Sequence, residues 1–182
     1  MKYIIVIVSL MSSVVYGQHF HTEYTYDEIL IQNSYPKGGL NYTHTDGNTY
    51  VYAVFWTQIT NTSDDEVNLS ISFNNKPFTI PNNPDNLFRV YLPKIDMNRK
   101  KDDLYNYGLD VKSFLHTHID KSSELEMTLA SNESHVFYTL VISTKAIKGT
   151  IRAGYQLHHN KLTYAINTHS MSCGKLMGKH KN

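Results

Sequence analysis

The sequence predicts an all-β protein, an antiparallel β-sandwich (Ig-like or jelly-roll-like) with one short helix around residues 110–118. Apolar side chains recur at every second position in several short segments, which is the period of a strand with one buried face. Turn-forming residues separate these segments, and no strand–helix–strand alternation is present. The length of 182 residues suits one domain. A small β-barrel built from the same strands is the alternative.

The amino terminus has the composition of a cleaved signal peptide over residues 1–17. A basic residue precedes an apolar stretch that is shorter than the roughly 20 residues needed to span a membrane. Gly17 supplies a small residue for cleavage before Gln18. We expect residues 18–182 to form one β-sandwich domain with a short flexible carboxy-terminal tail. The mature protein is expected to be secreted or periplasmic, without membrane insertion.

Alternation is strongest over residues 50–60, where both sets of alternate positions are largely apolar. This is typical of a strand covered on both faces, so Trp56 is expected in the core. Further strands are predicted at residues 29–31, 67–73, 88–92, 124–129, 136–142, 151–157 and 162–166. Turn residues lie at Asp46-Gly47, Asn74-Asn75, Lys148-Gly149 and His159-Asn160. Such short connections indicate antiparallel neighbours, because a parallel crossover needs a dozen or more residues.

Residues 93–121 interrupt the strand pattern. The mixed charges of residues 99–103 indicate a solvated loop. Beyond them, Asp110 is a suitable helix N-cap, and apolar residues follow it at helical spacing. We therefore predict a single short helix here, packed across an end or an edge of the sheets.

Composition excludes several classes of function. The 17 Lys and Arg residues nearly balance the 16 Asp and Glu residues, which gives no electrostatic case for binding nucleic acid. A single cysteine rules out an intramolecular disulfide. No serine-hydrolase, zinc-peptidase or phosphate-loop motif is present. We therefore predict a non-catalytic binding module without a cofactor, and keep a small secreted hydrolase as the third hypothesis.

Pairs of tyrosines are the leading candidates for ligand binding. Tyr105 and Tyr107 lie in the longest irregular stretch, and Tyr24 and Tyr26 lie near the mature amino terminus. Exposed aromatic rings offer flat apolar faces to a glycan or to a protein partner. In the structural alternative, the tyrosines fix the loop onto the sandwich. Long loops often carry function, so Tyr105 and Tyr107 are the first choices.

The carboxy-terminal stretch carries the second hypothesis, a copper-type metal site. His169, Met171 and Cys173 alternate, so they share a face if they lie on a strand. Imidazole, thioether and thiolate together suit Cu(I). In the alternative, Met171 and Cys173 fill the core edge of a last strand. We expect no tight site, because Gly174, Gly178 and the charged tail favour mobility. His158-His159 is predicted at a hairpin tip with its rings pointing apart.

Several short motifs carry a resemblance to a known group of proteins. They are residues 31–39 (IQNSYPKGG), 52–57 (YAVFWT), 106–108 (NYG), 151–154 (IRAG) and 173–174 (CG). In these motifs the chain resembles uncharacterised secreted β-sandwich-like proteins of marine Bacteroidetes. The resemblance implies export from a bacterial cell. That group has no assigned activity, so the resemblance gives no residue a function.

Overall fold

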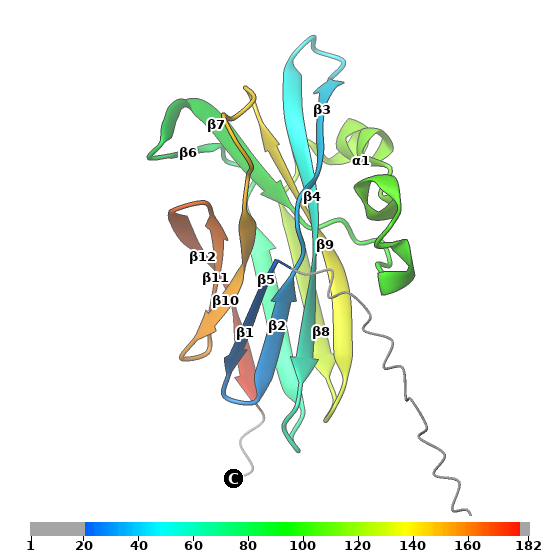
Figure 1. Ribbon diagram of the computed structural model, residues 1–182, viewed down its shortest axis with the longest axis vertical. Helices are drawn as coiled ribbons and strands as arrows, with labels where there is room; N and C mark the ends of the chain where they lie inside the picture. Colours follow the sequence, from blue (N-terminus) through cyan, green and yellow to red (C-terminus); the bar gives the residue numbers. More distant parts are fainter. Residues whose placement is uncertain (1–20, 179–182) are drawn as a thin grey trace, which may run out of the picture.

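The computed structural model describes residues 21–178, and the predicted signal peptide lies outside these residues. Two antiparallel sheets pack face to face in this part of the chain (Figure 1). The architecture confirms the predicted all-β sandwich and favours it over the barrel alternative, because the strands form two sheets. Of the predicted tail, the residues up to Gly178 belong to the last strand, and residues 179–182 lie outside the described range.

The seven-stranded sheet, sheet A, has the order β1-β2-β4-β9-β7-β6, and β3 also pairs with β4. Its strands are β1 (Thr22–Tyr26), β2 (Ile29–Asn33), β3 (Lys37–Thr43), β4 (Thr49–Asn61), β6 (Phe78–Ile80), β7 (Asn83–Tyr91) and β9 (Ser134–Ser143). The five-stranded sheet, sheet B, has the order β10-β11-β12-β5-β8. Its strands are β5 (Val67–Phe73), β8 (Ser123–Leu129), β10 (Ala153–His158), β11 (Lys161–Ile166) and β12 (His169–Gly178).

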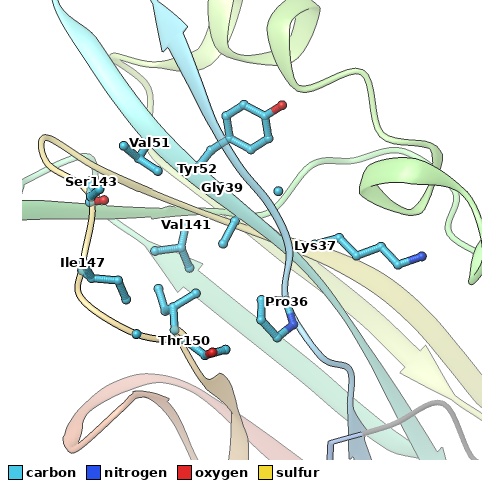
Figure 2. A pocket seen from close by; sticks show the side chains of 14 residues that line it. Pro36, Lys37, Gly39, Val51, Tyr52, Val141, Ser143, Ile147 and Thr150 are labelled. Atoms are coloured by element: carbon cyan, nitrogen blue, oxygen red, sulfur yellow. The ribbon is translucent and has the colours of Figure 1, made fainter.

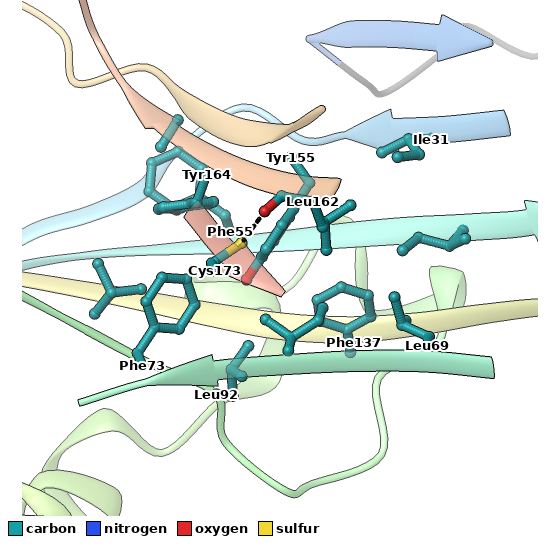
Figure 3. Close-up of a cluster of buried hydrophobic side chains, with 14 of the residues drawn as sticks. Ile31, Phe55, Leu69, Phe73, Leu92, Phe137, Tyr155, Leu162, Tyr164 and Cys173 are labelled. Atoms are coloured by element: carbon teal, nitrogen blue, oxygen red, sulfur yellow. Dashed lines mark hydrogen bonds between the residues drawn. The ribbon is translucent and has the colours of Figure 1, made fainter. Parts of the chain in front are cut away.

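The core between the sheets is rich in aromatic rings (Figure 3). Phe137 of sheet A packs against Tyr155 of sheet B with ring centroids 5.5 Å apart, and Tyr155 lies 4.7 Å from Tyr164. Phe55 enters the same layer from β4. Offset and edge-to-face packing of such rings stabilises a core beyond the area that it buries.

A second core lies on the outer face of sheet A, under residues 93–121, which we call the outer cap. The cap contains two 3₁₀ turns, Arg99–Lys101 and Tyr105–Gly108, and the helix α1 (Val111–His118) (Figure 1). The helix confirms the prediction around residues 110–118. Its N-cap is Asp110, whose side chain accepts a hydrogen bond from the backbone N–H of Ser113 at 3.1 Å.

Trp56 is fully buried beneath the outer cap, as predicted from the apolar character of both faces of its strand. The guanidinium carbon of Arg99 lies 4.0 Å from the centre of its ring. The hydroxyl of neighbouring Tyr138 donates to the carbonyl of Tyr107 at 2.7 Å. The cap thus packs against aromatic side chains of sheet A. A cation–π contact and a hydrogen bond between the cap and these side chains hold it in place.

One buried amide joins the two sheets where their edges meet. Asn33, at the end of β2, accepts a hydrogen bond from the backbone N–H of Tyr155 at 2.8 Å and donates to its carbonyl at 3.1 Å. Its side-chain oxygen also accepts from Thr57 at 3.0 Å. Asn33 therefore replaces a missing strand pairing between sheet A and β10. We call this contact, with β1 lying beside β10, the seam.

The last strand, β12, contains a β-bulge at Cys173. Leu162 pairs with Gly174 and Thr163 pairs with Ser172, so Cys173 is the extra residue between them. A Cβ atom on Gly174 would overlap the carbonyl oxygen of Ser70 on β5. Gly174 therefore permits close strand approach, and the expectation that it confers mobility was wrong.

Candidate functional site

The two first-choice tyrosines have different environments. Tyr105 is 58% exposed, and burial together with its hydrogen bond to Tyr52 raises its pKa to about 12. Tyr107 is 3% exposed, and its hydroxyl donates to the carbonyl of Tyr35 at 2.6 Å. Its ring packs edge-on to Trp56 and lies under the ammonium group of Lys37. The ring of Tyr107 is thus inaccessible to a ligand, which corrects the expected exposure.

Tyr24 and Tyr26 both lie on β1 at the seam. Tyr24 is 38% exposed, and its hydroxyl accepts a hydrogen bond from the side-chain amide of Gln156 on β10 at 2.7 Å. Tyr26 is half-buried, and its ring centroid lies 5.7 Å from that of His158 and 6.0 Å from that of His159. The two histidine rings do not point apart as predicted: their centroids are 4.1 Å apart. The seam therefore gathers aromatic rings from distant parts of the chain.

The three candidate metal ligands lie in different environments along β12. His169 stacks on Phe78 with ring centroids 5.9 Å apart, and Met171 is half-buried against the inner core. Cys173 is buried, and its Sγ donates to the carbonyl of Leu162 at 3.5 Å (Figure 3). Burial raises the pKa of its thiol to about 12. Cys173 is therefore protonated at neutral pH, whereas a metal ligand or nucleophile must be a thiolate.

Within residues 21–178, no group of three His, Cys, Asp or Glu side chains is arranged to hold a metal ion. Cys173 packs among the buried residues of the inner core, the position described by the alternative to the copper hypothesis. The same range contains no helix long and apolar enough to cross a bilayer.

A pocket of about 340 Å³ opens at the end of the sandwich, between β3 and the loop that connects β9 to β10 (Figure 2). We call it the mouth pocket. Core side chains of sheet A, including Ala53 and Val141, form its floor, and Ile147 and Thr150 of the connecting loop form its rim. The pocket is therefore an accessible extension of the inner core.

A bulge in β3 shapes the β3 wall of this pocket. The register with β4 shifts between Gly38 and Asn41. Gly38 has a φ of +131°, and a Cβ atom there would lie 2.6 Å from the carbonyl oxygen of Tyr52. Only glycine permits this close approach of β3 to β4 at the bulge.

The interior of the mouth pocket carries no charge. Lys37 is the one charged residue in the lining, and its side chain extends away from the pocket (Figure 2). Its ammonium donates to the carbonyls of Asp102 and Leu104 in the outer cap, the latter at 2.9 Å. The hydroxyl of Ser143 donates to the carbonyl of Lys145 at 2.9 Å. The chemistry offered to a ligand is thus apolar contact with a few neutral polar groups.

A shallower groove of about 110 Å³ runs along the seam. Its floor consists of small residues, among them Gly154 and Ala165, and Tyr24 lies on one side of it. Arg152 and His21 lie at one end, where an Nη1 of Arg152 donates to Nδ1 of His21 at 3.1 Å. We call this the seam groove.

Two larger hollows, each of about 490 Å³, have charged linings. One contains the carboxylates of Asp27, Glu28, Asp64 and Asp65, and the other contains Lys94, Asp96, Glu124, Glu126 and His135. Such linings are typical of solvated surface.

Comparison with known proteins finds no matching family, no matching curated protein and no matching solved structure.

Proposed function

We propose that this protein is a non-catalytic binding module that holds a small uncharged ligand in the mouth pocket. The observation that carries the proposal is the uncharged pocket floor, formed by core side chains that remain accessible at the end of the sandwich. Its volume of about 340 Å³ lies within the range of roughly 300–1,000 Å³ typical of small-molecule sites.

The chemistry of the lining favours an apolar ligand over a charged one. A charged group in the pocket would lose its hydration without gaining an ion pair, because Lys37 is directed toward the outer cap. An apolar ligand gains about 25 cal/mol for each Å² of surface that it removes from water. We therefore expect affinity to increase with apolar area until the pocket is filled.

A neutral fluorescent probe, N-phenyl-1-naphthylamine, tests this proposal. We expect saturable binding with increased emission in the wild-type protein. Thr150→Trp places a bulky side chain at the pocket rim and should weaken binding at least about tenfold. Lys148→Trp adds the same ring in the same loop, outside the lining, and should bind like wild type. Equal binding by both variants would contradict the proposal.

We also propose that the protein acts outside the cytoplasm, where a free protein or glycan partner is accessible. The support is the sequence of residues 1–17 and the resemblance described above. The exported protein should begin at Gln18. Intact-mass analysis of exported material checks this, and retention of residues 1–17 would contradict it.

A further inference from the structure

We infer that the seam groove binds an acidic glycan, a chain of sugar rings that carry carboxylate or sulfate groups. Tyr24 would contact the ring and Arg152 would contact the anionic group. This inference does not depend on the occupant of the mouth pocket, because no residue lines both sites.

The position of Tyr24 suits contact with a sugar ring. Its side chain is 38% exposed, and the hydrogen bond from Gln156 fixes the ring against β10. A fixed aromatic ring offers an apolar face without a large loss of conformational entropy on binding. Gln156 adds a second, planar polar side chain beside it, of the kind that can bond to hydroxyl groups.

The small floor of the groove determines how such a ligand would lie. Gly154 of β10 and Ala165 of β11 are paired and both line the groove, and Gly154 lies against the side chain of Asn33, which a Cβ atom there would meet at 2.6 Å. The volume of about 110 Å³ is too small to enclose a sugar ring. A ring therefore lies along the surface, open at its ends, which suits a unit within a longer chain.

The charge of Arg152 specifies an acidic ligand. None of the ion pairs found within residues 21–178 involves Arg152. Its side-chain partner is His21. The Nδ1 atom of His21 can accept a hydrogen bond only when the ring is neutral, because both ring nitrogens are donors in the protonated form. Burial, and then the charge of Arg152, lower the pKa of His21, which keeps that ring neutral. The guanidinium thus retains N–H donors for a carboxylate or a sulfate.

The one acidic residue of β1, Glu23, does not compete for this charge. Glu23 alternates with Tyr24, and alternate side chains on a strand lie on opposite faces. Its carboxylate accepts a hydrogen bond from Gln32 at 2.8 Å on the other side of the strand. The anion-binding end of the groove is therefore formed by Arg152 without an opposing carboxylate from β1.

Three galactose-based probes of matched length test the inference by calorimetric titration at low salt. They are an oligogalacturonate, a sulfated galactan oligosaccharide and a neutral galactan oligosaccharide. We expect at least one acidic probe to bind about tenfold or more tightly than the neutral probe. The two acidic probes distinguish carboxylate from sulfate. Equal affinity for acidic and neutral probes, or no binding of any probe, would overturn the inference.

Variants then locate the site. Arg152→Gln should abolish the preference for the acidic probe, whereas Lys161→Gln removes an equal charge from the first residue of β11, at the opposite end of the β10–β11 pair from Arg152, and should preserve it. Tyr24→Ala should weaken all the probes that bind. Arg152→Lys retains the charge and should keep part of the preference, so it serves if the glutamine variant does not fold. An unchanged preference in Arg152→Gln would overturn the assignment.

Discussion

At the scale of single residues, the buried amide of Asn33 is the main polar contact that holds the seam together. Replacing it with alanine would leave the N–H and the carbonyl of Tyr155 without partners in a buried environment. Each such loss costs about 1–3 kcal/mol. We expect Asn33→Ala to lower the free energy of unfolding by about 3 kcal/mol in urea denaturation.

Gln32 provides the matched control for this variant. It is the adjacent residue on β2, and it bonds to Glu23 near the surface. Gln32→Ala should change the free energy of unfolding by less than about 0.5 kcal/mol, as is usual at surface positions. Equal effects of the two substitutions would show that the seam contributes nothing specific.

The raised pKa of the buried Cys173 thiol predicts a loss of stability in alkaline solution. Its folded-state pKa is raised from 9.0 to about 12, so its contribution is fully present below about pH 9 and is lost as the pH rises toward 12. The loss is about 1.4 kcal/mol per pH unit in this window. Burial also raises the pKa values of Tyr155 and Tyr164, so these residues extend the loss above their ordinary value of 10.0.

The comparison with Cys173→Ala isolates this effect. Between pH 8 and pH 10, the wild-type protein should lose about 1.4 kcal/mol more stability than the variant, as measured by chemical denaturation at each pH. Parallel stability curves over this interval would show that the thiol ionises equally easily in the folded and unfolded chains.

At the scale of elements, two glycines of the same strand have opposite predicted behaviour. Gly174 lies against the backbone of Ser70, whereas a Cβ atom on Gly178 would meet no atom within 4 Å. Gly174→Ala should separate β12 from β5 and cost about 3 kcal/mol in thermal or chemical unfolding. Gly178→Ala should be close to neutral. A neutral Gly174→Ala would show that the two strands can move apart without cost.

The long buried strands could be predicted from sequence, and the short exposed ones could not. β4 and β9 are largely buried, so their apolar residues marked them clearly. β3 has five exposed positions and two glycines, which leave no alternating pattern. β7 begins at Asn83 and includes Pro84, whereas the strand predicted here begins only at residue 88. In that strand, the buried side chain of Asn86 accepts a hydrogen bond from the backbone N–H of Lys145.

The candidate sites were harder to predict from the sequence than the strands were. The exposure of Tyr24 was correctly expected, but its partner Gln156 is 132 positions away. Tyr107 was a first choice for ligand binding because it lies in the longest irregular stretch, whereas the tertiary fold packs its ring edge-on against Trp56. The mouth pocket joins residues 36–53 with residues 141–151. No local pattern encodes such a meeting of distant segments.

At the scale of the whole molecule, the described residues form three layers: sheet B, sheet A and the outer cap. β4 and β9 lie in the middle layer, where one face contacts sheet B and the other contacts the cap. This position explains why both faces of the predicted strand at residues 50–60 are apolar. The proposed sites lie outside the cap, where the sheets end or meet.

The sequence separation across the seam predicts an order of events in folding. Asn33 and Tyr155 are 122 positions apart, and bringing such distant residues together is slow because the chain must first lose much of its freedom. We expect the seam to close late, after each sheet has formed. Until then, the edges of β1 and β10 are open to pairing with another chain. We therefore expect a slower closure of the seam to lengthen the time during which each newly made molecule can aggregate.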